Sequence, residues 1–305
     1  MNKLTFYNLN LLTSPLPFKN YENISISKHK YKKILYGSEI KKSRTYNIIK
    51  KCYVDYETNK EQLEKVTPYD NFSKKTKEAL LHCYTGNTKL IRNLKQAIID
   101  NQNVFYRGTC AYCGLNETKY MDHYLPKDDF PEFSILSYNL VPCCSYCNEK
   151  KSKNFLDNTG ERKIFNPYFE KAEETPIINC KLVCLESILK FSIELRDNVS
   201  NKVFLNHLVT LGLIKRYEEQ LPRIIASIIF DLIVNFDETN ISIKKAKKVM
   251  DRKLKETESI QGNNSLLALV YRAFLEQDQL FDVDYLRKIY FKLRTSKKSR
   301  STVAS

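Results

Sequence analysis

The sequence contains two cysteine pairs of the same form, Cys110-Ala111-Tyr112-Cys113 and Cys144-Ser145-Tyr146-Cys147. Two residues between the cysteines of each pair let both sulfur atoms face one metal ion, and two such pairs complete a tetrahedral site. The spacing therefore predicts that Cys110, Cys113, Cys144 and Cys147 hold a structural Zn²⁺ ion. Because four protein ligands leave no open position on the metal, we expect this ion to stabilise the fold and not to react.

Cys143 stands beside Cys144 and offers a second register for the later pair. Only Cys144 is separated from Cys147 by two residues, so we assign Cys144 as the ligand. We expect Cys143 to be a small buried apolar residue. The other cysteines lack ligand spacing and are expected to be buried thiols, with a bond between the last two as the alternative: Cys52, Cys83, Cys180 and Cys184.

The segment between the two pairs carries side chains that suit the hydrolysis of a phosphodiester. A histidine with a pKa near neutrality can deprotonate water, and a hard divalent cation can neutralise the charge that builds on phosphate. Of the four histidines, only His123 combines a neighbouring carboxylate, Asp122, with a metal-bound setting, whereas His82 and His207 lie in helical patterns and are expected to be structural. Further polar residues complete the pattern: Asn139, Asn148 and Lys151.

From Cys110 to Asn154 these residues resemble the HNH, or ββα-metal, nucleases. The pattern of that family is a Cys-x-x-Cys pair, Asp-His, Asn-Leu, and a second pair followed by Asn or His and then Lys. The resemblance implies that His123 is the general base, that Asp122 binds a divalent metal ion, and that Asn139 holds the histidine loop in place. It also makes Asn148 a metal ligand, at a position where many relatives have His.

The identity of Asn148 bears on the choice of metal. Its amide oxygen is a hard ligand, which favours Mg²⁺ or Mn²⁺ over a softer ion. Asn148 and Lys151 are three residues apart on a predicted helix and share a face, so we expect Lys151 to meet a phosphate. Lys127 and Lys150 are the other expected contacts to nucleic acid.

Neighbouring residues of a regular strand point to opposite faces of the sheet. Asp122 and His123 can therefore approach one site only where the chain turns or bulges. We expect such a departure from the strand at this point, shortly before Pro126.

Four stretches resemble one subgroup, the HNH subunit of bacterial anti-phage systems of the Septu type, including those attached to retrons. They are Asp122-His123-Tyr124-Leu125-Pro126-Lys127, Phe130-Pro131-Glu132-Phe133-Ser134, Asn139-Leu140-Val141-Pro142-Cys143-Cys144 and Phe165-Asn166-Pro167-Tyr168-Phe169-Glu170. Asn166 stands where the subgroup has His, so no role is carried over to it. The resemblance implies a partner ATPase of the ABC or SMC-like type that restrains or delivers the nuclease.

The chain of 305 residues is basic, with 50 Lys and Arg against 35 Asp and Glu and a formal net charge of +15. A field of that sign attracts polyanions such as nucleic acid, although a merely basic soluble surface is the alternative. Lysines and tyrosines alternate between residues 21 and 46. They indicate either a docking or nucleic-acid arm or a solvated helix face, of which we favour the second.

Residues 1–18 lack the unbroken apolar run of a secretory signal. No stretch reaches the ~18 apolar residues that a membrane span needs. We therefore expect a cytoplasmic protein without membrane contact, in which cysteines are thiols or metal ligands.

The hydrophobic patterns predict an α+β fold that is mostly helical, with a small ββα-metal HNH unit and its four-cysteine zinc clamp embedded between helical regions. We expect a basic, mainly helical docking or nucleic-acid region at 1–105, the nuclease unit at 106–170 and a mainly helical domain at 171–305.

Individual elements follow from periodicity and turn residues. We expect strands at 120–123, 139–143, 177–183 and 189–195, and helices within 74–101 (broken near Gly86) and at 145–154, 243–255, 265–275 and 283–293. Pro222 is expected to begin a helix. The helix before it is expected to carry one apolar face: Leu205, Leu208, Leu211 and Ile214.

Three functions agree with these features. The first is a metal-dependent endonuclease acting in anti-phage defence, with DNA as the expected substrate ahead of RNA. The second is a zinc-containing module that binds nucleic acid without cutting it. The third is an interaction subunit that docks an ATPase and cleaves only within the complex.

Overall fold

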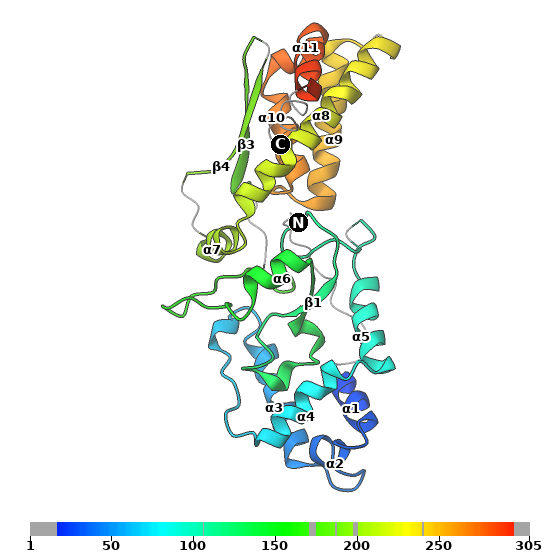
Figure 1. Ribbon diagram of the computed structural model, residues 1–305, viewed down its shortest axis with the longest axis vertical. Helices are drawn as coiled ribbons and strands as arrows, with labels where there is room; N and C mark the ends of the chain where they lie inside the picture. Colours follow the sequence, from blue (N-terminus) through cyan, green and yellow to red (C-terminus); the bar gives the residue numbers. More distant parts are fainter. Residues whose placement is uncertain are drawn as a thin grey trace, which may run out of the picture. The chain divides into compact units, whose positions relative to one another are not determined.

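The computed structural model describes residues 17–105, 107–170, 175–186, 188–197, 201–239 and 241–295. Helices predominate, and two small two-stranded sheets accompany them (Figure 1). The predicted α+β class with mostly helical content is confirmed. The chain divides into two compact units. Within the described ranges, residues 6–170 and 203–211 form the cysteine-cluster unit, and residues 171–202 and 212–305 form the C-terminal unit. The three predicted regions stay a prediction.

The N-terminal part of the cysteine-cluster unit is a set of helices joined by short turns. They are α1 Pro17–Ser27, α2 Lys32–Leu35, α3 Arg44–Thr58, the 3₁₀ turn η1 Leu63–Lys65, α4 Lys74–Thr85 and α5 Lys89–Asp100. Ser43 and Ser73 cap α3 and α4, since each side chain accepts a backbone N–H from the first turn. α4 and α5 separate at Gly86 and Asn87, as the sequence predicts.

The tyrosines that alternate with lysines in this region contribute to its core. The Tyr21 ring lies 6.5 Å from the Tyr46 ring and 6.1 Å from the Tyr53 ring, and all three side chains are buried. The Tyr21 hydroxyl donates to a backbone carbonyl at 2.8 Å, so its polar end is satisfied. Lys28 is also buried, and its Nζ donates to the carbonyl of His82 in the last turn of α4. Part of the pattern that suggested an exposed arm or face thus belongs to the interior.

The two Cys-x-x-Cys pairs, called the first and second knuckles, flank a hairpin, and a short helix begins within the second knuckle. β1 Tyr120–His123 pairs antiparallel with β2 Leu140–Cys143, and α6 Ser145–Lys151 follows. The 3₁₀ turns η2 Pro131–Phe133 and η3 Ser137–Asn139 fill the connection between the strands. The predicted strand, strand and helix are present. α6 ends three residues before the predicted Asn154, because Ser152 adopts a positive φ of 46°.

The C-terminal unit combines a long hairpin with helices. β3 Ile178–Cys184 pairs antiparallel with β4 Leu189–Leu195, and β3 contacts α10 while β4 contacts α8. The helices are α8 Leu213–Thr239, α9 Ile243–Gln261, α10 Leu266–Leu275 and α11 Val283–Thr295, with the 3₁₀ turn η4 Asp278–Phe281. Both predicted strands and the last three predicted helices are present.

Two expectations about the helices around residue 212 are wrong. The four leucine and isoleucine positions do not share one helix, because α7 Lys202–Thr210 ends before Gly212, which has a φ of 57°. Pro222 lies inside α8 and does not begin it. Buried residues continue at helical spacing through that point, at Tyr217, Leu221 and Ile225. We infer that their burial outweighs the roughly 3 kcal/mol that an internal proline costs.

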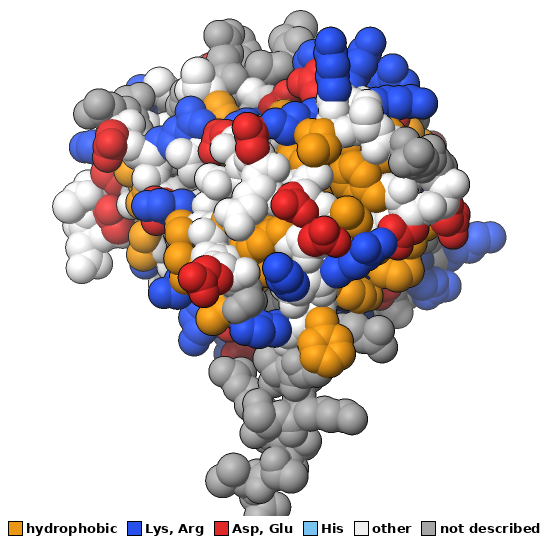
Figure 2. Space-filling view, turned by 90° about the horizontal axis from the view of Figure 1, so that it is seen from above, with side chains coloured by type: hydrophobic (Ala, Val, Ile, Leu, Met, Phe, Trp, Pro, Cys, Tyr) orange, Lys and Arg blue, Asp and Glu red, His pale blue; other side chains and the backbone are white. Residues whose placement is uncertain are grey.

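Charges of both signs are mixed on one face of the molecule (Figure 2). Figure 2 shows lysine and arginine side chains interspersed with acidic ones on the face in view, and not gathered in one block. The net charge of +15 therefore does not by itself identify a binding face. Among the described residues, no helix combines the length and the apolar character that crossing a bilayer requires.

Candidate metal cluster and active site

The four predicted zinc ligands come together in the folded chain. The sulfur atoms of Cys110, Cys113, Cys144 and Cys147 all lie within 4.8 Å of one another, and the four residues are buried. A zinc–sulfur bond of about 2.3 Å puts the ligands of a tetrahedral ion about 3.8 Å apart. The cluster therefore fits a structural metal ion such as zinc.

Local geometry explains why these cysteines converge. Gly114 takes a φ of 65° directly after the first pair, and its N–H donates to the carbonyl of Cys110 at 2.9 Å. Cys144 is the N-cap residue of α6, and its sulfur accepts the N–H of Cys147 at 3.5 Å. A helix N-terminus favours a negative sulfur, which is the form that binds metal. Cys143 is buried outside the four-sulfur group, as predicted.

His207 ties the first knuckle to a distant helix. The Phe165 N–H donates to Nδ1 of His207 at 3.2 Å, so the ring proton lies on Nε2, which is 2.8 Å from the Tyr112 carbonyl. The side chain is fully buried, and burial lowers its pKa to about 4. The predicted structural role of His207 is confirmed.

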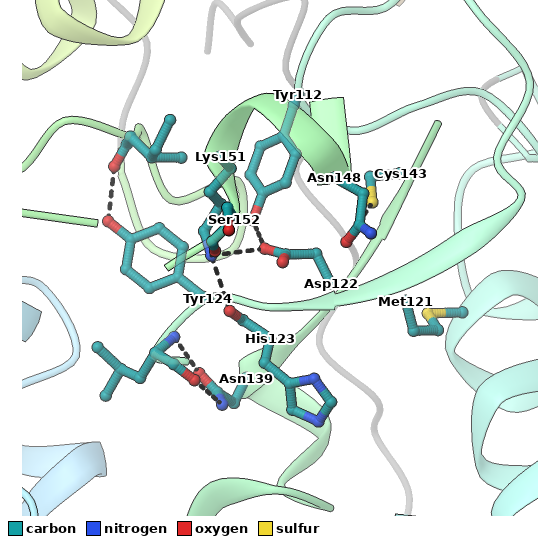
Figure 3. A network of polar contacts seen from close by, with 12 residues as sticks. Tyr112, Met121, Asp122, His123, Tyr124, Asn139, Cys143, Asn148, Lys151 and Ser152 are labelled. Atoms are coloured by element: carbon teal, nitrogen blue, oxygen red, sulfur yellow. Dashed lines mark hydrogen bonds and ion pairs between the residues drawn. The ribbon is translucent and has the colours of Figure 1, made fainter. Parts of the chain in front are cut away.

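The strand through Asp122 and His123 is regular. Asp122 pairs with Val141 and His123 with Leu140, without a bulge, and β1 ends at His123. Figure 3 shows Asp122 above the β1 ribbon, with Tyr112, Lys151 and Asn148, and the His123 ring below it. The expected turn or bulge between the two residues is therefore wrong, because the ladder to β2 continues through both. The carboxylate and the imidazole leave opposite faces of the hairpin.

Asp122 is held by two buried groups. Its Oδ2 atom lies 2.9 Å from Nζ of Lys151 and accepts a hydrogen bond from the Tyr112 hydroxyl at 2.7 Å. Burial raises the pKa of Asp122, and the charge of Lys151 opposes that rise. A buried carboxylate without a counter-charge is unstable, and the Lys151 ammonium provides that counter-charge to Asp122.

Lys151 does not lie at the surface where a phosphate contact was expected. It is fully buried, and its Nζ also donates to the carbonyl of His123 at 2.8 Å. The predicted phosphate contact stays a prediction and now requires Lys151 to leave Asp122. Lys150 is exposed. Lys127 is one-third exposed and pairs with Asp128 at 3.2 Å.

The His123 ring is oriented by a backbone carbonyl. Its Nε2 lies 2.9 Å from the carbonyl of Ser134, so Nε2 carries the proton and Nδ1 keeps a lone pair. The Ser134 hydroxyl donates to the carbonyl of Leu80 at 2.9 Å and fixes that loop to α4. Burial lowers the pKa of His123 to about 3, and nearby lysines contribute. The imidazole is therefore unprotonated at neutral pH, but a pKa this low makes it a weaker base than the near-neutral histidine expected from the sequence.

Asn139 lies where a residue that holds the histidine loop must lie. Its Oδ1 accepts the Leu125 N–H at 2.8 Å, and its Nδ2 donates to the Leu125 carbonyl at 3.0 Å. The backbone carbonyl of Asn139 accepts the Tyr124 N–H at 2.9 Å. These bonds fix the two residues that follow His123.

Asp122 and Asn148 offer oxygen donors on the same side of β1 (Figure 3). Asn148 is half-buried on α6, and its Oδ1 is 4.0 Å from the Cys143 sulfur. A carboxylate and an amide oxygen match the chemistry of Mg²⁺ or Mn²⁺, which often take few protein ligands and keep several waters. By residue type the two side chains suit such an ion, but Oδ2 of Asp122 is already bonded to Lys151 and Tyr112.

Sequence patterns did not identify four residues around these side chains. Tyr112 and Ser134 bond Asp122 and His123 directly. Tyr84, from α4, contacts the His123 ring, and Lys95, from α5, lies over the ring of Tyr84. Of the four, only Tyr112 has a sequence signal, because it lies between two ligand cysteines. The other three come close to the site through tertiary folding alone.

Two known proteins are similar to parts of this chain. Protein ea31 of Escherichia phage lambda is 31% identical over 97 residues, which cover 32% of this chain and 33% of that protein. Septu protein PtuB of Bacillus thuringiensis is 34% identical over 79 residues, which cover 24% of this chain and 28% of that protein. Each match thus spans a third or less of the relative. No family model and no solved structure matches the chain.

Proposed function

We propose that this chain is a metal-dependent HNH endonuclease that hydrolyses phosphodiester bonds, in DNA ahead of RNA, as part of Septu-like anti-phage defence. The observation that carries the proposal is the position of His123 on β1 of a β1–β2–α6 unit, between the two pairs of buried cysteines. The partial similarity to PtuB supports the link to defence.

His123 acts as the base in this proposal. With Nε2 bonded to the Ser134 carbonyl, Nδ1 is the atom that takes a proton from the attacking water. The water oxygen then bonds to phosphorus as the bond from phosphorus to the leaving oxygen breaks. Asn139 acts as a positioning residue, because it fixes the backbone at Leu125, directly after the strand that carries His123.

Asp122 and Asn148 are the residues that would hold a catalytic Mg²⁺ or Mn²⁺. When bound, such an ion neutralises the charge that develops on phosphate and steadies the leaving oxygen. Because Asp122 and His123 leave opposite faces of β1, we expect the phosphate to be bound at the end of the strand, where His123 is its last residue.

Cleavage assays test the proposal. Plasmid DNA and bulk RNA are incubated with protein dialysed free of loosely bound metal, with Mg²⁺, Mn²⁺ or neither added, while zinc content is monitored. We expect cutting only when a hard cation is present, loss of cutting in His123→Ala, and retention in His82→Ala, which changes an exposed histidine. Cutting by His123→Ala at the wild-type rate would remove His123 from the role of base.

A non-cleaving zinc module is the second candidate, favoured by the contacts of Asp122 with Lys151 and Tyr112. It predicts that the wild-type protein binds nucleic acid but does not cut it under any metal condition. The resemblance to Septu nuclease subunits also implies a partner ATPase of the ABC or SMC-like type. Co-expression with an ATPase encoded beside the gene, followed by affinity purification and the same assays, tests whether cleavage requires that complex.

A further inference from the structure

A tyrosine from the N-terminal helices lies against the His123 ring, and a lysine lies over that tyrosine. The rings of Tyr84 and His123 have centroids 4.4 Å apart at 72°, an edge-to-face contact. Nζ of Lys95 lies 4.0 Å from the centroid of Tyr84, over its ring. Lys95 is thus one tyrosine ring away from the imidazole. Two helices outside the strand–strand–helix unit therefore form part of the surroundings of His123.

Lys95 differs from the other lysines close to His123 in lacking an acidic partner. Lys127 pairs with Asp128, and Lys151 pairs with Asp122. None of the ion pairs found in the described part of the chain involves Lys95. Its side chain is half-buried, and burial lowers its pKa.

A half-buried cation without a counter-ion gains from an anion. The Tyr84 ring offsets part of the desolvation through a cation–π contact, but it supplies no negative charge. A phosphate group supplies that charge and accepts a hydrogen bond from an ammonium group. Under the proposed nuclease function, the anion that has to come close to His123 is a backbone phosphate.

We propose that Lys95 binds a backbone phosphate of nucleic acid beside His123, and that Tyr84 is a positioning residue for both side chains. The inference rests on the proposed function and adds a substrate contact from α5. Tyr84 is suited to this role because its hydroxyl donates to the Met121 carbonyl on β1 at 3.1 Å while its ring contacts His123 and Lys95. A contact to the phosphate depends on charge and not on the identity of the base, so the binding should not depend on the nucleotide sequence.

Equilibrium binding without cleavage tests the role of Lys95. Wild type, Lys95→Gln, Lys95→Arg and Lys89→Gln are titrated against a fluorescein-labelled DNA duplex of mixed sequence, without added divalent metal, over a series of salt concentrations. Lys89 is an exposed lysine at the start of the same helix and serves as the matched control. Thermal unfolding and zinc content identify any variant that does not fold.

We expect Lys95→Gln to bind about tenfold more weakly at low salt. The slope of log affinity against log salt should become shallower by about 0.9, the change expected when one phosphate contact in a duplex is lost. Lys95→Arg should restore most of the affinity and slope, and Lys89→Gln should stay within about twofold of wild type. A Lys95→Gln protein that folds and keeps the wild-type slope would overturn the inference.

Tyr84 is tested through two substitutions and a kinetic readout. Tyr84→Phe keeps the ring and should retain most of the binding and cleavage. Tyr84→Leu removes the ring between Lys95 and His123, so both the affinity and the kcat of cleavage should fall. Equal behaviour of folded Tyr84→Leu and wild type would remove Tyr84 from the proposal.

The outcomes separate this inference from the proposed nuclease function. If wild type binds DNA and never cuts it, while Lys95→Gln shows the shallower slope, the phosphate contact stands and the nuclease proposal fails. If wild type cuts DNA and Lys95→Gln matches it in KM, kcat and salt slope, the nuclease proposal stands and the Lys95 contact is wrong. Absence of DNA binding by wild type would overturn the Lys95 contact directly.

Discussion

Lys151 and Asp122 form an ion pair in the interior of the cysteine-cluster unit, with Nζ 2.9 Å from Oδ2 and side-chain exposures of 0% and 7%. The Tyr112 hydroxyl and the His123 carbonyl complete the hydrogen bonds of the pair. Such a pair is expensive to break by removing one partner, because the other charge is left buried without compensation. Lys151 therefore links the stability of the unit to the residue proposed to bind metal.

Replacing Lys151 with methionine should lower the free energy of unfolding by about 3–5 kcal/mol, since Asp122 loses its buried counter-charge. The double variant Asp122→Asn, Lys151→Met should recover much of this loss. Urea unfolding followed by circular dichroism measures both values. A loss below about 1 kcal/mol in Lys151→Met would mean that the pair is open to water in solution.

The four-cysteine cluster should bind one zinc ion per chain. Cys147→Ser should lose that ion and much of its folded structure, because a structural site contributes its binding free energy to folding. Cys143→Ser is the matched control, since Cys143 is buried next to the cluster but outside it, and it should keep its zinc. Elemental analysis of purified proteins gives the metal content. Loss of zinc in Cys143→Ser alone would support the other register.

Asn139→Ala should destabilise the unit by about 2–3 kcal/mol, because it leaves the buried N–H and carbonyl of Leu125 without partners. If the chain is a nuclease, kcat should fall as well, as the segment after His123 loosens. Asn139→Asp tests the two bonds separately, since a carboxylate can accept from the Leu125 N–H but cannot donate to the Leu125 carbonyl. An Asn139→Ala protein with wild-type unfolding would contradict the bonding described for this side chain.

Glu132 should make stability fall as pH rises. Its side chain is buried in η2, Oε1 accepts the Tyr69 N–H at 2.8 Å, and burial raises its pKa from 4.5 to about 7. Between these two values the folded state binds the proton and the unfolded state does not. Unfolding free energy should therefore decrease by up to about 3 kcal/mol as pH rises through this window.

Urea unfolding at several pH values compares wild type with two variants. Glu132→Gln should remove most of the dependence between pH 4.5 and about 7, whereas Glu117→Gln, at an exposed position, should keep it. Stability that rises with pH through this window in wild type, and not in Glu132→Gln, would show that Glu132 is ionised in the folded state.

The features that were predictable from the sequence are those fixed by local spacing. Two Cys-x-x-Cys pairs specify their own geometry, and β1, β2 and the start of α6 follow from the residues between and after them. Asn139 was found through the resemblance to the HNH pattern and not through spacing, because its bonds to Leu125 join residues 14 positions apart. The bulge expected between Asp122 and His123 is absent, because pairing with β2 outweighs the local tendency to turn.

Features that depend on tertiary packing were not predictable. The position of Lys151 suggested a surface residue, but its burial depends on the Asp122 carboxylate and the His123 carbonyl, which face it from β1. Tyr84 and Lys95 belong to helices α4 and α5, and the periodicity that predicts these helices does not indicate that they pack near His123. Pro222 marks the start of a helix by local rules, and only the buried face of α8 carries the helix through it. Single-sequence patterns contain no information on such long-range contacts.

The contacts of His207 set the shortest fragment that can retain this site. The β1–β2 hairpin and α6 end well before residue 170. However, His207 on α7 bridges the Tyr112 carbonyl and the Phe165 N–H, and α7 belongs to the same compact unit. A fragment ending at residue 170 would contain every proposed catalytic and zinc-binding residue but would leave both backbone groups exposed. A fragment that keeps this bridge has to include α7, and it then also carries the β3–β4 hairpin without the α8 and α10 helices that the hairpin contacts.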